Sequence, residues 1–334
     1  MQDTHISLAH GNGGRLMRKL IDEVFARHLG REHLDTHVDA ATIELPEGRA
    51  MITTDGFTVQ PLEFPGGDIG TLAVHGTCND LAVAGATPCF LTLNAFIEEG
   101  LELALLDRLV ASVARAASES DVSVVAGDTK VVRRGEGGGL YLATTGVGYA
   151  PTDLDLSMHR VKAGDRVLVS GPVGDHGTAV MLAREEFGMR GDLASDAASV
   201  LPLTTAALIV EGLRFMRDPT RGGLATVMHE LVQITGLQVR LEQTSIPIRD
   251  QVASVCEMLG YDPLFLACEG RVVAVVAPDS ADLLLKTWRA LPEGEGAADV
   301  GGLVEGRSRV VLLTELGGER IIEELEEDPL PRIC

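Results

Sequence analysis

Hydrophobic residues recur along the chain at two spacings, one typical of helices and the other of strands. In residues 15–29, Leu16, Leu20 and Val24 recur at steps of four and mark one face of a helix. Shorter apolar runs bounded by turn residues alternate with further helical stretches. In the first half of the chain the predicted helices are 68–84 and 102–120, and the predicted strands are 50–57, 88–97 and 121–127. This alternation predicts an α/β (α+β) fold in which mixed sheets are covered by helices.

The second half repeats this plan after a boundary near residues 150–155. A β-hairpin predicted from residues 131–134 and 140–149 ends the first half. The strands expected beyond the boundary are 166–171, 237–241, 271–277, 299–305 and 309–313. The helices expected there are 178–187, 203–215, 222–235, 249–259 and 280–291. Residues 192–199 are interpreted as a polar linker, and residues 317–328 as an acidic helix that stops at Pro329. We therefore expect two domains of similar plan.

Composition narrows the classes of protein to which the chain can belong. Apolar residues make up 45% of it, which predicts a globular protein, and the net charge of −21 disfavours binding to nucleic acid. The five cysteines have no CxxC spacing and fit neither a disulfide framework nor a zinc site. No apolar run approaches the roughly 18 residues of a membrane span. We therefore expect a cytoplasmic protein in a reducing compartment.

Carboxylates stand where predicted strands run into glycine. Asp55 precedes a glycine and Asp128 follows Gly127, each at the end of an apolar strand. Ligands of α/β proteins bind beyond the ends of strands, so both carboxylates are candidates for a ligand site. Lys130 falls on the same face as Asp128 if the strand continues. Asp80, within an apolar helix, requires a cation or hydrogen-bond donors. Taken singly, each aspartate is as easily a turn or capping residue.

Two glycine-rich segments precede predicted helices. Residues 10–14 (His-Gly-Asn-Gly-Gly) lead into the helix at 15–29, and residues 218–223 lead into the helix at 222–235. Backbone N–H groups at the start of a helix can hold a phosphate. Such loops are more often plain turns, so neither segment indicates a phosphate site by itself.

The sequence ends in a cysteine, Cys334. Residues 329–334 contain two prolines, which favour an extended arm with a reach of roughly 20 Å. A thiol at the end of such an arm is suited to carry a chemical group between sites. The alternative is a frayed terminus that happens to end in cysteine.

Five segments occur in the order seen in the aminoimidazole ribonucleotide synthetase (PurM-like) superfamily, which includes selenophosphate synthetase and thiamine-monophosphate kinase. They are residues 39–41, 53–56, 79–82, 127–130 and 218–224. Within that superfamily, residues 10–14 and 331–334 resemble those of the HypE family of hydrogenase maturation factors. The resemblance covers essentially the whole chain. A selenophosphate synthetase would carry a reactive Cys or selenocysteine and a Lys in the N-terminal glycine loop, where this chain has Asn12 and Arg15.

The resemblance implies a two-domain PurM-like fold and an ATP-dependent dehydratase that acts on its own terminal cysteine. In the HypE family, the carbamoyltransferase HypF loads the thiol with a carbamoyl group, which the enzyme converts to a thiocyanate. The cyanide then passes to iron on a HypC–HypD complex during [NiFe]-hydrogenase assembly. The implied parts are an N-terminal loop and helix (1–38), an ATP-binding domain that pairs in a homodimer (39–152), a C-terminal domain (153–318) and a flexible tail (319–334).

The resemblance also assigns roles to single residues. Cys334 is implied as the carrier thiol, with Glu269 as base and Lys130 as cation beside it. The residues implied to bind ATP are Asp39, Asp55, Asn79, Asp80, Gly127, Asp128, Gly222 and Gly223. The implied Mg²⁺ ligands are Asp39, Asp80 and Asp218. Removal of water from an amide agrees with this set, because it needs ATP to activate the oxygen and Mg²⁺ prefers oxygen ligands.

Three other functions stay open at this point. One is a non-catalytic thiol carrier, which would hydrolyse no nucleotide. Another is a structural protein whose terminal cysteine binds metal, although no His or Cys lies near it in the sequence. The third is a different ATP-dependent ligase or kinase of the same superfamily.

Overall fold

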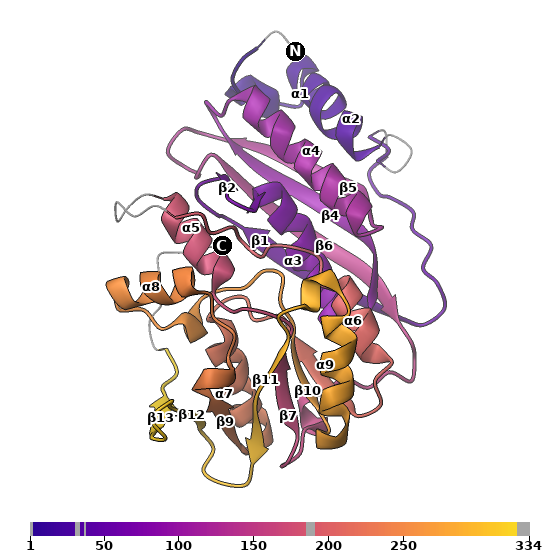
Figure 1. Cartoon of the computed structure of the whole chain (residues 1–334). Coiled ribbons are helices and arrows are strands. Elements are labelled where there is room, and N and C mark those ends of the chain that lie inside the picture. The colour runs from indigo at the N-terminus through magenta and orange to yellow at the C-terminus, as the bar shows by residue number, and fades with distance from the viewer. Residues whose placement is uncertain (1–2, 31–33, 37, 185–190, 326–334) are drawn as a thin grey trace. The chain divides into compact units, whose positions relative to one another are not determined.

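The computed structural model describes residues 3–30, 34–36, 38–184 and 191–325. Within these residues the chain forms two compact units, drawn as a ribbon in Figure 1. Unit 1 comprises the chain up to Leu81 together with Ala86–Thr152, and unit 2 comprises Ala82–Gly85 and the chain from Asp153 onward. Cys334 and the arm predicted at residues 329–334 lie outside the described residues.

Unit 1 opens with helical segments and continues with a four-stranded sheet. The helical segments are η1 (Leu8–Gly11), α1 (Arg15–Leu20), η2 (Ile21–Phe25) and α2 (Ala26–Leu29). The last three follow one another without a break, which confirms the helix predicted at 15–29 and adds a π-helical turn in its middle. The other elements are β1 (Arg49–Phe57), β2 (Glu63–Phe64), β3 (Gly67–Asp68), α3 (Ile69–Val83), β4 (Thr87–Glu98), α4 (Leu103–Glu119), β5 (Ser123–Val132) and β6 (Leu140–Ala150).

The strand order in this sheet is β1-β6-β4-β5, with β4 and β5 parallel and the other pairs antiparallel. The predicted hairpin of residues 131–134 and 140–149 is therefore wrong, because β4 lies between β5 and β6. The connection from β5 to β6 crosses the end of β4. There Glu98 accepts hydrogen bonds from Gly135 N at 2.6 Å and from Gly139 N at 3.0 Å. A side chain that is remote in sequence thus sets the path of this connection.

Helices α3 and α4 cover one face of the sheet of unit 1 (Figure 1). Gly76 of α3 lies so close to Phe57 of β1 that an added Cβ would come within 2.9 Å of the aromatic ring. Gly70 approaches α4 as closely, with an added Cβ 2.5 Å from the Leu109 carbonyl oxygen. On the opposite face Ile52 is 73% and Phe96 is 42% exposed. The sheet of unit 1 thus buries one face and leaves the other open.

Unit 2 contains a seven-stranded mixed sheet in the order β13-β12-β9-β11-β7-β10-β8. Only β12 and β9 are paired in parallel. The strands are β7 (Arg166–Val169), β8 (Leu213–Arg217), β9 (Gln238–Glu242), β10 (Val273–Val276), β11 (Ala298–Val304), β12 (Val310–Leu313) and β13 (Glu319–Ile322). The helices are α5 (Asp175–Ala183), α6 (Leu201–Leu208), α7 (Gly223–Thr235), α8 (Asp250–Leu259) and α9 (Ala281–Arg289). Mixed sheets in both units agree with the predicted fold class.

Both faces of the sheet of unit 2 are buried. Alternate residues of β10 belong to two different cores: Val273 and Val275 pack in the core that includes α7, whereas Ala274 and Val276 pack in the core that includes α6 and α9. Trp288 of α9 is fully buried in the second core. A strand covered on both sides reads as a continuous apolar run, which is the pattern of residues 272–276. No helix in the described ranges is long and apolar enough to cross a membrane.

Two predicted helices of the second half are corrected by the structure. The stretch predicted as helix at 203–215 contains most of α6, which ends at Leu208, then a turn and the start of β8. Gly212, with a φ of +95°, lies in this turn directly before the strand. The acidic segment 317–328 contains strand β13, which pairs with β12 after a turn closed by Thr314 N and Gly318 O at 2.8 Å. Ile322 is buried at 3% exposure. Residues 319–322 therefore belong to the sheet and not to the tail.

Candidate functional site

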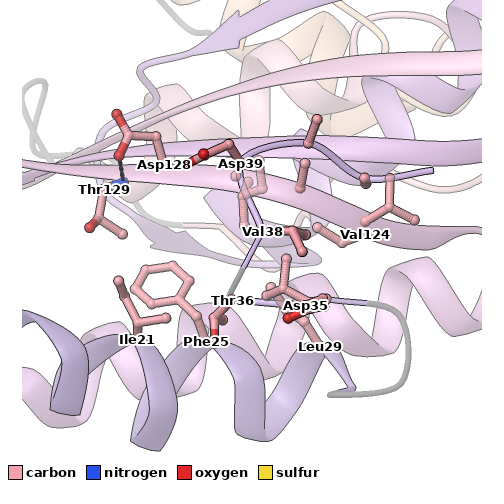
Figure 2. A pocket seen from close by; sticks show the side chains of 17 residues that line it. Ile21, Phe25, Leu29, Asp35, Thr36, Val38, Asp39, Val124, Asp128 and Thr129 are labelled. Carbon is pink, nitrogen blue, oxygen red and sulfur yellow. Dashed lines mark hydrogen bonds between the residues drawn. The ribbon is translucent and has the colours of Figure 1, made fainter.

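A cavity of about 190 Å³ lies in unit 1 between the edge strand β5, the helical segments η2 and α2, and residues 34–41. Figure 2 shows Ile21, Phe25 and Leu29 of the helix on one side of it and Asp39 and Asp128 on the other. The cavity thus has an apolar wall that faces a pair of carboxylates.

Three of the residues predicted to bind ATP meet at this cavity: Asp39, Gly127 and Asp128. Both aspartates are exposed, and Asp128 Oδ1 accepts a hydrogen bond from Thr129 N at 2.8 Å. At Gly127 an added Cβ would come within 2.3 Å of the Leu93 carbonyl oxygen, so only glycine fits there. The cavity therefore has room for a ligand beside two hydrated carboxylates.

Asp55 and Asp80 form a second group, on the face of the sheet that α3 covers. Thr53 Oγ1 donates a hydrogen bond to Asp80 Oδ2 at 2.9 Å. An added Cβ at Gly76 would lie 3.9 Å from Asp55 Oδ2. Since Gly76 and Asp80 are one helical turn apart, both carboxylates lie along the same side of α3. Asn79 precedes Asp80 and is buried at 2% exposure.

The two aspartates predicted at strand ends lie inside strands. Asp55 pairs with Thr144 within β1, which continues to Phe57. Asp128 pairs with Asn94 within β5, which continues to Val132. An Asp next to a Gly favours a turn only where no neighbouring strand extends the ladder. The strand predicted at 50–57 is thus confirmed with Asp55 near its end, whereas the strand predicted to end at Gly127 is wrong, because β5 continues to Val132.

Lys130 lies on the open face of the sheet of unit 1. Successive side chains of β5 point to opposite faces of the sheet, so Asp128 and Lys130 are exposed and Thr129 between them is buried, as predicted. Lys130 pairs with Phe96, whose ring is also exposed. Lys130 and the pair of Asp55 and Asp80 are therefore on opposite faces of one sheet.

The glycine loop at residues 10–14 packs against β5. An added Cβ at Gly11 would come within 2.8 Å of Val131 Cβ, so the loop is fixed beside the strand that carries Lys130. His10 is 1% exposed, and its Nδ1 accepts a hydrogen bond from Ser7 N at 3.0 Å. Gly13 and Gly14 are exposed. The histidine thus stabilises the loop, and the glycines offer accessible backbone.

Asp218 and Glu269 lie on neighbouring loops of unit 2. Both are buried, at 6% and 5% exposure. Cys268 N donates a hydrogen bond to Pro219 O at 3.0 Å, which joins the two loops. Gly223, with a φ of +58°, starts α7 so close to the second loop that an added Cβ would lie 2.5 Å from Leu266 O. Gly222, the residue before it, has a φ of +75°. This start of α7 brings four predicted site residues of unit 2 into one region.

A buried ion network beside Glu269 escaped the sequence analysis. Asp175 Oδ2 lies 2.9 Å from Arg249 Nε and 3.6 Å from Arg271 Nη2, and Asp196 Oδ2 lies 3.3 Å from Arg271 Nε. Asp196 falls in the segment 192–199 that was interpreted as a linker, yet its side chain is 1% exposed. The available signal was Arg271, a charge two residues after Glu269 at the start of an apolar strand.

Three of the four cysteines in the described part of the chain are buried, and Cys89 in β4 is half-buried. Cys78, Cys256 and Cys268 are buried, as predicted, at 1%, 3% and 0% exposure. Burial raises the pKa of Cys78 to about 12 and that of Cys256 to about 11. It also raises the pKa of Cys268. These thiols stay protonated at neutral pH and are poor nucleophiles.

The carboxylates of unit 1 fit Mg²⁺ bound through substrate phosphates better than a metal cage. Among the described residues, no group of three or more His, Cys, Asp or Glu is arranged to hold a metal ion. Mg²⁺ commonly binds through one or two carboxylates, with water and phosphate oxygens as its other ligands. The pairs Asp39–Asp128 and Asp55–Asp80 each supply such carboxylates.

Known proteins resemble the chain along its whole length. Two family models match it: AIR synthase related protein, N-terminal domain, over residues 37–150, and AIR synthase related protein, C-terminal domain, over residues 162–313. The chain is 46% identical over 336 residues to carbamoyl dehydratase HypE of Azotobacter vinelandii, which covers 100% of this chain and 98% of that protein.

Solved structures agree with these matches. A crystal structure of hydrogenase maturation protein HypE in complex with ATP has a TM-score of 0.93 and 41% identity, covering 98% of this chain and 99% of that one. A HypE–HypF complex gives a TM-score of 0.80 and 41% identity, covering 92% of this chain and 99% of that one. The resemblance inferred from the sequence motifs is thus confirmed. The chain belongs to the AIR synthase related family and, within it, to the HypE proteins.

Proposed function

We propose that this chain is an ATP-dependent carbamoyl dehydratase of [NiFe]-hydrogenase maturation. It converts an S-carbamoyl group on Cys334 to a thiocyanate, which supplies cyanide for the iron of the hydrogenase. The observation that carries this proposal is the full-length match to proteins named carbamoyl dehydratase HypE, at 46% identity in Azotobacter vinelandii and 38% in Escherichia coli.

The reaction is balanced by one ATP. The carbamoyl oxygen attacks the γ-phosphate and ADP leaves. The nitrogen then loses its protons to a base as the C–O bond breaks, and a C≡N bond and inorganic phosphate form. Phosphorylation is needed because the oxygen of an amide is a poor leaving group, whereas phosphate is a good one.

Most of the proposed nucleotide-binding residues belong to unit 1, and Asp218, Gly222 and Gly223 belong to unit 2. A relative of the same family was solved with ATP. In this chain Asp39, Asp55, Asn79, Asp80 and Asp128 provide polar groups on both sides of the sheet of unit 1, and Gly127, Gly222 and Gly223 provide close-packed backbone. The proposed Mg²⁺ ligands are Asp39 and Asp80, which lie in separate groups of unit 1, and Asp218 of unit 2. Mg²⁺ would neutralise charge on the phosphates during transfer.

Glu269 is the proposed base. It is 5% exposed, and a carboxylate shielded from water is a stronger proton acceptor than a hydrated one. Lys130 is the proposed cation that balances charge on the departing phosphate. The proposed carrier thiol is Cys334, because Cys78, Cys256 and Cys268 are buried and Cys89 is a half-buried residue within β4.

The open face of the sheet of unit 1 is the proposed homodimer contact. Ile52, Val147 and Phe90 occupy adjacent positions on β1, β6 and β4, and Ile52 is 73% exposed. An apolar sheet face of this kind favours pairing with a second copy. The other proposed partners are a HypF-like carbamoyltransferase, supported by the solved HypE–HypF complex, and a HypC–HypD-like iron scaffold. We propose that the protein works in the cytoplasm.

Mass spectrometry of the terminal peptide tests the function. After incubation with ATP, Mg²⁺ and the carbamoylating partner, the peptide that ends in Cys334 should first gain a carbamoyl group and then lose water. Cys334→Ala should fold and bind ATP but carry no adduct. An adduct of normal yield at another cysteine of that variant would overturn the assignment. Carbamoylation without any loss of water would favour the thiol-carrier alternative.

A further inference from the structure

The loop that carries Glu269 is held in place by three segments remote from it in sequence. Cys268 N donates to Pro219 O at 3.0 Å, and Gly177 N at the start of α5 donates to Ala267 O at 3.1 Å. Glu269 N donates to Asp196 Oδ1 at 3.2 Å. Of these three contacts, only the last is made by a side chain. It is therefore the one that a substitution can remove.

Asp196 is itself fixed by Arg271. Arg271 Nε lies 3.3 Å from Asp196 Oδ2, and the same guanidinium also lies 3.6 Å from Asp175 Oδ2 and donates to Pro172 O at 3.1 Å. Since Arg271 follows Glu269 by two residues, Asp196 accepts a hydrogen bond from the loop on Oδ1 and forms an ion pair with the loop's continuation at Oδ2. The neighbouring Ser195 Oγ shares a hydrogen bond of 2.8 Å with His176 of α5.

The packing leaves Asp196 little freedom. Its side chain is 1% exposed, and an added Cβ at Gly270 would lie 1.9 Å from the Asp196 carbonyl oxygen. Two arginines, Arg249 and Arg271, face the two aspartates of the cluster, so its formal charges cancel. Burial raises the pKa of Asp196, while Arg271 and the N–H groups of Glu269 and Gly270 act against that rise.

We propose that Asp196, held by Arg271, is a positioning residue for Glu269: its carboxylate fixes the backbone from which the proposed base reaches the carbamoyl nitrogen. This inference rests on the proposed function. Displacement of a reacting group by about 1 Å can slow a reaction on the order of 10²-fold, so the dehydration step is where the loss of this hydrogen bond has its effect. ATP binding and acceptance of the carbamoyl group do not depend on it.

The test is single-turnover dehydration of the carbamoylated full-length protein, followed by mass spectrometry of the terminal peptide. Asp196→Ala is expected to slow the loss of water on the order of 10²-fold and to leave ATP affinity and carbamoyl loading unchanged. Asp196→Asn keeps an oxygen that can accept from Glu269 N but loses the ion pair with Arg271, so it is expected to recover part of the rate. A rate in Asp196→Asn no better than in Asp196→Ala overturns the proposal.

Asp165→Ala is the matched control. Asp165 is also buried, accepts a backbone hydrogen bond from Lys162 N at 2.8 Å and lies 3.5 Å from Arg214 Nε. It immediately precedes Arg166, the first residue of β7, whereas α5 follows the other end of that strand, at Val169. We expect Asp165→Ala to lower the melting temperature as much as Asp196→Ala does and to dehydrate at the wild-type rate. Equal slowing in both variants would mean a general loss of stability and would refute the positioning role.

Arg271→Lys is the second variant, in case Asp196→Ala does not fold. Lysine keeps the buried charge but lacks the planar fork that contacts both aspartates, so dehydration is expected to slow with ATP affinity unchanged. Glu269→Gln separates the two proposals. If Glu269→Gln is blocked and Arg271→Lys runs at the wild-type rate, only the positioning role fails. If Glu269→Gln itself runs at the wild-type rate, the base assignment fails and the positioning role with it.

Discussion

The two units place their carboxylates in opposite surroundings. In unit 1, Asp39 and Asp128 are exposed beside a cavity, on a sheet that buries only one face. In unit 2, Asp218 and Glu269 are almost fully buried beside a sheet that is covered on both faces. A hydrated carboxylate suits a Mg²⁺ ion that keeps its own waters, whereas a desolvated one suits proton transfer. The depth of burial therefore matches the proposed roles of Asp39, Asp128 and Glu269, whereas Asp218, a proposed Mg²⁺ ligand, is buried like Glu269.

The largest effect, a slower dehydration step, is expected from Glu269→Gln, which removes the charge of the buried carboxylate of unit 2. General base catalysis contributes on the order of 10²- to 10⁴-fold, so dehydration in a single turnover should slow by about that factor. The variant should still bind ATP and accept the carbamoyl group, so the terminal peptide should accumulate at the carbamoyl mass. Loss of water at the wild-type rate would show that the buried carboxylate of unit 2 is not the base.

The next largest effect is expected on stability, from a substitution that truncates a core side chain of unit 2. Leu168 of β7 is 0% exposed, so Leu168→Ala is expected to lower the free energy of unfolding by about 2–5 kcal/mol. Denaturant unfolding followed by circular dichroism measures the change. The matched variant is Ile52→Ala in unit 1, measured on the single subunit, which should change stability by less than about 0.5 kcal/mol because the side chain is 73% exposed there. Similar losses in both variants would contradict the contrast between a covered and an open sheet.

Asp80→Asn should act on nucleotide binding with little effect on folding. The substitution removes one charge from the pair along α3 but keeps an oxygen that can accept from Thr53 Oγ1. Isothermal titration should show Mg²⁺-dependent ATP affinity reduced on the order of 10-fold or more, as expected when a charged contact is lost. Glu44→Gln, an exposed change in the same unit, serves as control. Wild-type affinity in Asp80→Asn would remove Asp80 from the metal site.

The smallest change in stability is expected from Ile52→Asp, which should act on dimerisation and hardly affect the folding of the single subunit. A charge on the open face should dissociate the proposed dimer, which light scattering after gel filtration detects. Unfolding of the resulting monomer should shift by no more than about 0.5 kcal/mol, since the position is exposed. A dimer that persists in Ile52→Asp would place the contact on another surface.

Local patterns predicted a helix or strand correctly where its apolar residues repeat at the period of that element and form one buried face. The helix at 15–29 and α4 are of this kind, because their apolar faces repeat every turn. The hairpin failed since nothing within residues 131–149 reveals that β4 inserts between the two strands. Gly212 was the visible signal against a helix at 203–215, because its positive φ requires a residue without a Cβ.

The site was predictable to the extent that ordered motifs identify a family. Asp39, Gly127 and Asp128 do meet at one cavity. Asp196 could not be found in this way, since its burial is produced by Arg271 and Glu269, which are remote in sequence, and its own segment has no periodic pattern. Charges buried by remote partners are invisible to patterns that extend over a few residues.

Strand β13 sets the point from which the proposed carrier thiol, Cys334, is tethered. Its pairing with β12 and the burial of Ile322 anchor the chain there, so the tether of Cys334 starts at residue 323. The twelve residues from 323 to 334 can span at most about 40 Å, roughly twice the reach counted from Pro329 alone. A tether of this length would hold its end group at a local concentration in the millimolar range. In the proposed function, each active site would thus meet its substrate at a concentration set by the sheet that anchors the tether, regardless of how dilute the protein is.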